Sequence, residues 1–211
     1  MNGPHQGQPI LTTGAALEQA SAAMILVHGR GADAGSILEL AGEFDRPELA
    51  YLAPQAAGST WYPNRFIAPL ESNEPYLTSA LQAVGDLLAH VEQAGIPAEK
   101  TVLLGFSQGA CLALEFAARN ARRFGGVVAL SGGLIGPPGT AFEYPGSLEG
   151  TPVFLGCSDV DFHIPVARVH ESTAAMRKLG GDVTERIYPN MGHTVNQDEI
   201  DFVRDLLAKL T

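Results

Sequence analysis

The sequence predicts an α/β fold with a mostly parallel central sheet and helices on both of its faces. Six short apolar stretches end in Gly, Pro, Ser or Asn, as strands buried on both faces do. Segments in which apolar residues recur with helical spacing lie between these stretches. Because strands that alternate with helices are typical of parallel sheets, the two patterns together predict the fold class.

Each predicted strand is justified by its apolar content and by the turn residue that ends it. In chain order the six strands cover residues 23–27, 50–53, 101–106, 127–131, 152–156 and 183–188. Residues 11–14 are assigned as an additional strand at the edge of the sheet. This order leaves room for a helix in most of the connections, as parallel neighbours require.

Five helices are predicted between and after these strands, over residues 36–44, 75–95, 108–120, 165–179 and 196–210. The longest carries a single apolar face that includes Leu77, Val84 and Val91. The helix over residues 165–179 has a proline in its first turn and ends before two glycines, which is the usual asymmetry of helix ends.

Two segments, residues 58–74 and 133–150, fit neither pattern and are rich in Gly, Pro and aromatic residues. Long loops in a compact domain are usually functional or disordered. The aromatic side chains favour ordered pocket walls over disorder, and they are Trp61, Tyr62, Phe66, Phe142 and Tyr144.

The chain length of 211 residues suits one domain over residues 1–211, in which roughly 70% of the unfolded surface is buried. Residues 1–10 show no strand or helix pattern, and we expect this segment, with His5, to be loose and disordered. The only two cysteines, Cys111 and Cys157, are expected to be buried free thiols, because two widely spaced cysteines do not make a disulfide framework.

The formal net charge of −10, without any basic cluster, argues against binding to nucleic acid. The same sign argues against docking on anionic membranes. No apolar run approaches the roughly 18 residues of a membrane span, so we expect no stable membrane insertion and a cytoplasmic protein. The expected partner is a small molecule, and the chain is expected to be a monomer or a homodimer.

A candidate nucleophile lies in the motif Gly105-Phe106-Ser107-Gln108-Gly109, between a predicted strand and a predicted helix. A serine in such a sharp turn can project its hydroxyl above the sheet while the helix directs its positive N-terminus toward it. The two glycines leave room for a strained turn and for close packing of strand and helix. The motif alone occurs by chance, but the strand–turn–helix context favours Ser107 as a nucleophile over a simple turn residue.

The best candidate for the general base is His193, which lies between the last strand and the last helix. Loops at the carboxyl ends of parallel strands surround the ligand site of open α/β sheets, and Ser107 occupies such a loop as well. The loop after residue 156 supplies two carboxylates to orient the histidine, and the order Ser, Asp, His is typical of α/β-hydrolases. We prefer Asp161 because of its spacing to Ile164-Pro165, and Asp159 is the alternative.

The fourth part of the candidate site, after the serine, the histidine and the carboxylate, is the loop Val27-His28-Gly29-Arg30-Gly31 that follows the first buried strand. Acyl transfer builds negative charge on the carbonyl oxygen, and preorganised backbone N–H groups stabilise it. We expect these donors to be the backbone N–H groups of Arg30 and Gln108. His28 is expected to brace the loop.

The set of motifs resembles the phospholipase/carboxylesterase family of α/β-hydrolases, which includes acyl-protein thioesterases and bacterial carboxylesterases. The resemblance covers residues 23–210 and rests on the motifs above together with Ser59-Thr60-Trp61-Tyr62 and Met191-Gly192-His193. It implies an α/β-hydrolase fold with a minimal cap, a triad of Ser107, Asp161 and His193, an oxyanion hole of Arg30 and Gln108, and no cofactor.

The function that follows is hydrolysis of small carboxylic esters through an acyl-enzyme. Two alternatives stay open: a thioesterase or lysophospholipase acting on longer acyl chains, and a binding protein that keeps the fold without turnover. We expect no metal site, because Asp159, Asp161 and His163 have no fourth ligand with a recognisable spacing.

Two positions depart from the family pattern. Arg30 stands where the family usually has an apolar residue, and Phe162 stands where a proline usually follows the acid. A guanidinium near an acyl pocket suits a polar or anionic acyl group better than a long alkyl chain. The alternative is a surface-pointing Arg30 paired with Asp33 or Glu39. We further predict that Trp61 lines the substrate pocket, with Arg30 near its mouth.

Overall fold

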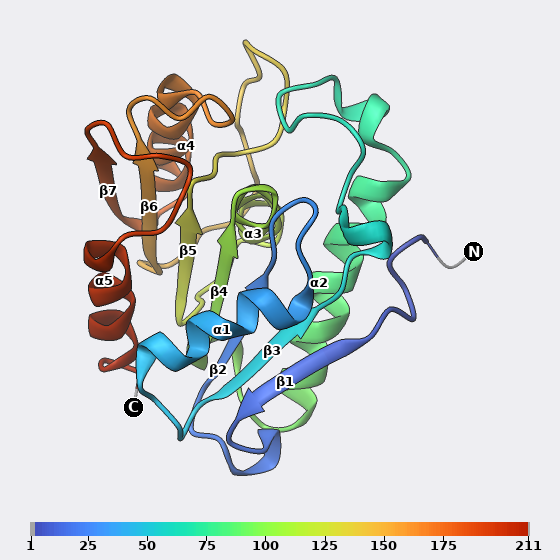
Figure 1. Cartoon of the computed structure of the whole chain (residues 1–211), viewed down its shortest axis with the longest axis vertical. Coiled ribbons are helices and arrows are strands. Elements are labelled where there is room, and N and C mark those ends of the chain that lie inside the picture. The colour runs from blue at the N-terminus through green and yellow to red at the C-terminus, as the bar shows by residue number, and fades with distance from the viewer. Residues whose placement is uncertain (1–2, 211) are drawn as a thin grey trace.

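The computed structural model describes residues 3–210 and contains a seven-stranded sheet in the order β1-β3-β2-β4-β5-β6-β7 (Figure 1). All neighbouring strands are parallel except β1, which pairs antiparallel with β3 at one edge. The strands are β1 (Ile10–Gly14), β2 (Ala23–Val27), β3 (Ala50–Pro54), β4 (Thr101–Phe106), β5 (Gly126–Leu130), β6 (Pro152–Ser158) and β7 (Asp182–Tyr188).

Helices cover both faces of this sheet and divide the core into two layers. One layer is formed with α1 (Ala34–Phe44) and α5 (Gln197–Leu207), and the other with α2 (Tyr76–Gln93), α3 (Gln108–Arg119) and α4 (Val166–Lys178). Short 3-10 helices cover Leu17–Gln19, Ala57–Ser59, Leu70–Asn73 and Ala98–Lys100. Over residues 3–210 no helix combines the length and the apolar character that a bilayer crossing requires.

The predicted fold class is confirmed, and most predicted boundaries lie within two residues of those observed. The central strands are buried on both faces, but β1 is exposed along its length and β7 is largely half-buried because both lie at sheet edges. The last helix ends at Leu207, three residues earlier than predicted. Strand β6 continues two residues past its predicted end, since Cys157 and Ser158 still pair with β7.

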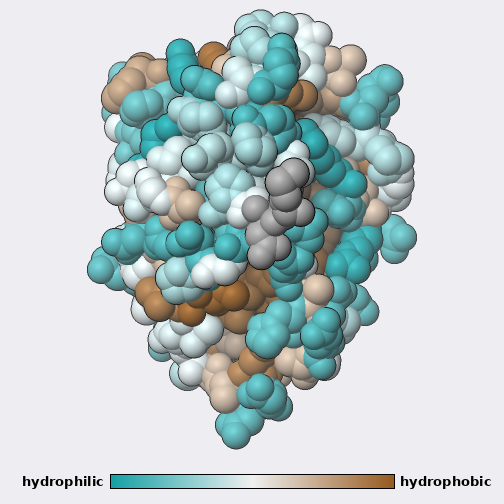
Figure 2. All heavy atoms as spheres, turned by 90° about the vertical axis from the view of Figure 1, so that its right-hand side faces the viewer, coloured by the Kyte–Doolittle hydropathy of each residue, from teal (hydrophilic) through white to brown (hydrophobic). Residues whose placement is uncertain are grey.

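The expectation of a loose N-terminal segment is wrong for residues 3–10. The side chain of His5 is buried, its Nε2–H donates to the carbonyl of Trp61 at 2.8 Å, and its Nδ1 accepts from the N–H of Ala57 at 3.0 Å. Burial lowers the pKa of His5, which favours the neutral ring that these two bonds require. The segment crosses the face shown in Figure 2, which is mostly hydrophilic with one apolar strip.

A buried carboxyl group lies at the N-terminus of α5. The N–H of Glu199 donates to Oδ1 of Asn196, and the N–H of Asn196 donates to Oε2 of Glu199, which makes a reciprocal cap. The Oε1 atom of Glu199 is buried without a partner against Gly156, where any side chain would collide with it. Burial raises the pKa of Glu199 to about 7.

This buried carboxyl should make stability depend on pH. The pKa of Glu199 is raised from 4.5 to about 7 on folding, so between these values the folded protein holds a proton that the unfolded chain releases. The group therefore stabilises the fold below about pH 4.5, and about 3 kcal/mol is lost as the pH rises through 7. We expect Glu199→Gln to abolish this loss in urea unfolding across that window. The exposed Glu39→Gln is the control, and pH profiles that coincide for all three proteins would contradict the expectation.

Candidate active site

Ser107 occupies a strained turn between the end of β4 and the start of α3. Its backbone has φ 54° and ψ −118°, a conformation that non-glycine residues rarely adopt. The N–H of Ser107 donates to the carbonyl of Leu130 on the neighbouring strand at 2.9 Å. A Cβ at Gly105 would collide with the carbonyl of Gly109, and a Cβ at Gly109 would collide with the carbonyl of Val27. The glycines are therefore required by close packing of strand against helix.

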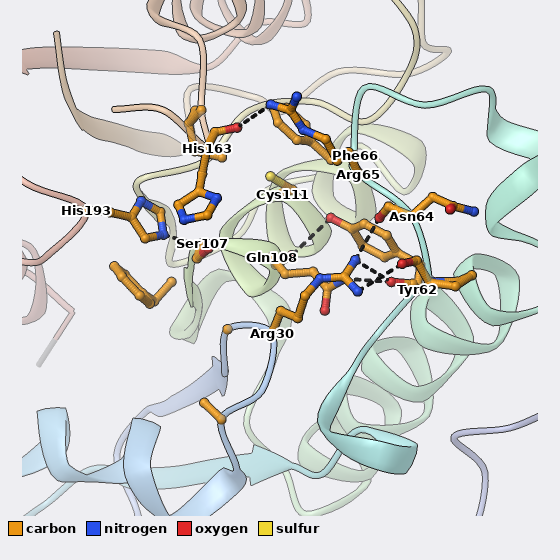
Figure 3. A pocket seen from close by; sticks show the side chains of 15 residues that line it. Arg30, Tyr62, Asn64, Arg65, Phe66, Ser107, Gln108, Cys111, His163 and His193 are labelled. Carbon is orange, nitrogen blue, oxygen red and sulfur yellow. Dashed lines mark hydrogen bonds between the residues drawn. The ribbon is translucent and has the colours of Figure 1, made fainter. Parts of the chain in front are cut away.

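The side chains of Ser107, His193 and Asp161 form one continuous chain of hydrogen bonds. The Ser107 hydroxyl lies 2.8 Å from Nε2 of His193, and Nδ1 of His193 lies 2.6 Å from Oδ2 of Asp161. The structure thus joins the three residues predicted from the sequence, which come from the ends of β4, β7 and β6 (Figure 1), and Figure 3 shows Ser107 and His193 of this group.

The carboxyl group of Asp161 is held ionised by its hydrogen bonds. Its Oδ1 accepts the backbone N–H groups of His163 and Ile164 at 2.8 and 3.1 Å. Desolvation opposes ionisation, but the bond from His193 and these two N–H groups outweigh it, so the pKa of Asp161 lies below its ordinary value. The alternative, Asp159, does not contact His193 but accepts the N–H of Asn190 at 2.8 Å, which braces the loop that carries the histidine.

The loop after β2 is fixed close to Ser107. His28 is fully buried, its Nδ1–H donates to the carbonyl of Gly29 at 2.8 Å, and its Nε2 accepts the N–H of Ala56 at 3.1 Å. His28 therefore braces the loop, as predicted. Arg30 and Gln108 both line the pocket beside Ser107, and no acceptor in residues 3–210 takes either backbone N–H.

The side-chain amide of Gln108 links the turn at Ser107 to the loop after β3, a contact that the sequence did not indicate. Its Nε2 donates to the carbonyl of Tyr62 at 2.8 Å, and its Oε1 accepts the N–H of Trp61 at 2.9 Å. Both bonds are buried, so breaking either one leaves an unsatisfied polar group. The amide therefore holds the loop in a fixed position relative to Ser107.

The prediction that Trp61 lines the pocket is wrong. Its side chain is fully buried, with ring centroids 5.3 Å from His5 and 5.0 Å from His28, and its Nε1–H donates to the carbonyl of His28 at 2.8 Å. The indole is held there because this carbonyl satisfies its only polar atom. Trp61 supports the loop from beneath and does not reach the cavity.

The cavity beside Ser107 has a volume of about 590 Å³ and is drawn in Figure 3. Tyr62 and Phe66 line it, as the aromatic content of residues 58–74 predicted. Phe142 and Tyr144 do not; they line a separate hollow with Lys178. Besides Ser107 and His193, the wall residues are Gly29, Arg30, Ala32, Tyr62, Pro63, Asn64, Arg65, Phe66, Phe106, Gln108, Cys111, His163 and Ile164.

Arg30 lines this cavity with an exposed side chain and pairs with neither Asp33 nor Glu39. Its guanidinium donates to three consecutive backbone carbonyls, those of residues 62–64, at 2.7 to 2.9 Å. Two further residues were missed from the sequence. Arg65 donates from Nη2 to the carbonyl of His163 at 3.3 Å, and the His163 ring lies 4.8 Å from the ring of His193. Only the placement of both residues in predicted loops could have indicated them.

Both cysteines are buried and free, as predicted. Burial raises the pKa of each thiol to about 12, so neither is an available nucleophile near neutral pH. The remaining histidines lie outside the site: His90 is exposed on α2, and His170 pairs with Glu185. Across residues 3–210, no three His, Cys, Asp or Glu side chains group closely enough to hold a metal ion.

Comparison with known proteins gives a consistent result. Residues 10–211 match the profile of the family described as Phospholipase/Carboxylesterase. A crystal structure of phospholipase/carboxylesterase from Dyadobacter fermentans is 40% identical, covers 99% of this chain and 100% of its own, and superposes with a TM-score of 0.93. The crystal structure of esterase PE8 is 26% identical, with coverage of 97% and 98% and a TM-score of 0.75.

Curated relatives match over a shorter part of the chain. Acyl-protein thioesterase 1 of Neurospora crassa is 32% identical over 129 residues, which is 59% of this chain and 51% of the relative. The protein of the same name from Gibberella zeae is 31% identical and is covered to 54%. The chain thus spans about half the length of the curated relatives it matches.

If Trp61 supports the loop and does not face the cavity, its removal should destabilise the fold. We expect Trp61→Ala to lower the free energy of unfolding by about 3–5 kcal/mol, the usual effect of truncating a core tryptophan. Urea unfolding followed by far-UV circular dichroism measures the loss. Phe142→Ala, in a loop where the ring is only partly buried, is the control and should lose much less. A loss below about 1 kcal/mol for Trp61→Ala would show that the indole does not belong to the core.

Proposed function

This chain belongs to the phospholipase/carboxylesterase family, and we propose that it is a serine hydrolase that cleaves small carboxylic esters through an acyl-enzyme. The observation that carries the proposal is the continuous hydrogen-bonded chain from Ser107 through His193 to Asp161 at the end of a cavity. The 40% identical phospholipase/carboxylesterase of D. fermentans, matched over nearly the whole chain, supports the same class of reaction.

In the proposed acylation step, the Ser107 Oγ attacks the ester carbonyl while its proton passes to Nε2 of His193. Asp161 accepts the Nδ1–H, which fixes the tautomer that leaves Nε2 free and stabilises the imidazolium that forms. The tetrahedral intermediate collapses when His193 returns the proton to the leaving alcohol. The 2.8 Å distance between Oγ and Nε2 already suits the first proton transfer.

The backbone N–H groups of Arg30 and Gln108 are the proposed donors to the oxyanion. Both residues lie at the cavity wall beside Ser107, and Gln108 begins α3, whose N-terminus adds a positive partial charge. Each such donor contributes roughly 3–4 kcal/mol of transition-state stabilisation where it has been measured. In deacylation, water attacks the acyl-enzyme with His193 as base, and the same donors act again.

The volume of the cavity is compatible with a small ester. About 590 Å³ lies within the range of ordinary small-molecule sites. A thioester of the same acyl group would pass through the same acyl-enzyme, and the names of the curated relatives make acyl thioesters the second candidate. The third candidate is a binding protein without turnover. The labelling experiment below distinguishes it from the two hydrolases, which act on esters or on thioesters.

A fluorophosphonate probe should label the wild-type protein, and Ser107→Ala should abolish both labelling and ester turnover, with turnover falling by at least about 10³-fold. Ser131→Ala is a matched control, because Ser131 directly follows the adjacent strand β5 and has a similar positive φ of 55°, but its hydroxyl is buried and has no hydrogen-bond partner within residues 3–210. We expect Ser131→Ala to be labelled at the wild-type rate. An unlabelled but folded wild-type protein would favour the binding protein.

Asp161→Asn should reduce kcat by about 10⁴-fold, because an amide no longer holds the histidine in the required tautomer. Asp159→Asn should reduce kcat less than about tenfold, because the amide oxygen still accepts the N–H of Asn190. Steady-state kinetics of both variants on one aryl ester measures the contrast. Comparable losses in the two variants would refute the assignment of the triad acid.

A further inference from the structure

We propose that the acyl part of the substrate carries an anionic group, such as a carboxylate, and that the guanidinium groups of Arg30 and Arg65 bind it. This inference rests on the proposed ester hydrolysis at Ser107 and specifies its substrate class. The two arginines line the same cavity as Ser107 and His193. Among the described residues that line it, there is no aspartate or glutamate.

Neither guanidinium is neutralised by the protein. Within residues 3–210, no carboxylate lies within 4.0 Å of Arg30 or Arg65. In the same range Arg123 and Arg177 also lack a carboxylate partner, but they lie outside the cavity, and the other six arginines each pair with one, namely Arg46, Arg119, Arg122, Arg168, Arg186 and Arg204. The formal net charge of the whole chain is −10, whereas the two arginines without a carboxylate partner make the charge in this cavity locally positive. Such a local field attracts an anionic ligand.

Both guanidiniums keep donors free for a ligand. Arg30 donates three N–H groups to the carbonyls of residues 62–64. Because a guanidinium has five N–H groups, the others stay free. Arg65 spends one on the carbonyl of His163. The bonds of Arg30 also hold its side chain in one orientation, so less conformational entropy is lost when it binds a carboxylate or phosphate oxygen.

The placement of these groups indicates which side of the ester bears the anion. His193 must deliver a proton to the leaving alcohol, so the alcohol lies on the histidine side of Ser107. Figure 3 shows Arg30, Tyr62 and Gln108 on the side of Ser107 opposite His193, whereas the guanidinium of Arg65 lies beside the carbonyl of His163 at another part of the cavity wall. The acyl group extends into the part of the cavity on the side of Arg30. Tyr62 and Phe66 supply apolar walls there, so the expected substrate has a short hydrocarbon spacer between the ester carbonyl and the anion.

The test compares two aryl esters that differ only in charge. Mono-4-nitrophenyl adipate carries a terminal carboxylate, and its methyl ester is neutral and of similar length. We expect wild type to have the higher kcat/KM on the anionic ester, and we expect the ratio of the two kcat/KM values to fall about fivefold or more in Arg65→Gln, mainly through KM. A larger fall is expected in the Arg30→Gln/Arg65→Gln double variant. Arg65→Lys, which keeps the charge, should restore part of the ratio.

Arg46→Gln is the matched control, because Arg46 is an arginine just before β3, at the amino end of the sheet and far from the cavity. It should leave the ratio unchanged. Raising the salt concentration should lower the wild-type ratio, since screening weakens the attraction of exposed charges. If the arginines only brace the loop, both esters will slow equally in the variants and the ratio will stay within about twofold, which would overturn the proposal. The proposed ester hydrolysis is tested independently by fluorophosphonate labelling of Ser107. A labelled protein with an unchanged ratio would therefore contradict only the proposal about the anionic acyl group.

Discussion

The turn at Ser107 is the constraint on which the rest of the site depends. A non-glycine residue at φ 54° is unfavourable, and it persists because the surrounding packing permits no other path. Because Gly105 and Gly109 have no side chains, the backbones of β4, α3 and the end of β2 can pack in direct contact. Once this contact is made, the hydroxyl of Ser107 projects above the sheet, the N-terminus of α3 lies beside it, and the loop with Arg30 is brought within reach.

Around this turn, buried polar groups are satisfied in ways that couple separate loops. Asp161 accepts two backbone N–H groups of its own loop as well as the ring of His193, so the carboxylate is oriented before any substrate binds. Preorganisation of this kind lowers the barrier because the dipoles need not reorient during the reaction. The buried amide of Gln108 has a similar effect elsewhere in the site, because it connects the loop with Tyr62 to the turn at Ser107.

The sheet, the helices and the triad could be predicted because each leaves a local pattern: apolar runs, helical periodicity and glycine-flanked turns at the ends of strands. The spacing to Ile164-Pro165 favoured Asp161 as the partner of His193 but left Asp159 open, because both carboxylates lie in the same loop. The burial of Trp61 could not be predicted, since it depends on His5, which lies 56 residues away and in a segment without any pattern. Arg65 was missed for a similar reason, because its relation to His163 spans 98 residues and two irregular loops.

The double role of Arg30 and Gln108 has a consequence for how this protein can diverge. Each residue lines the cavity beside Ser107, and its side chain forms hydrogen bonds with the backbone of residues 61–64. Insertions or deletions in that loop should therefore shift the cavity wall together with the residues beside Ser107, so the two parts of the site are expected to change at once. The segment around Phe142 and Tyr144 does not line the cavity, and it is linked to the cavity wall through Arg168, whose guanidinium lies over the rings of Phe142 and Phe66. Because this segment contributes no residue to the cavity itself, sequence drift and new surface functions should accumulate there first.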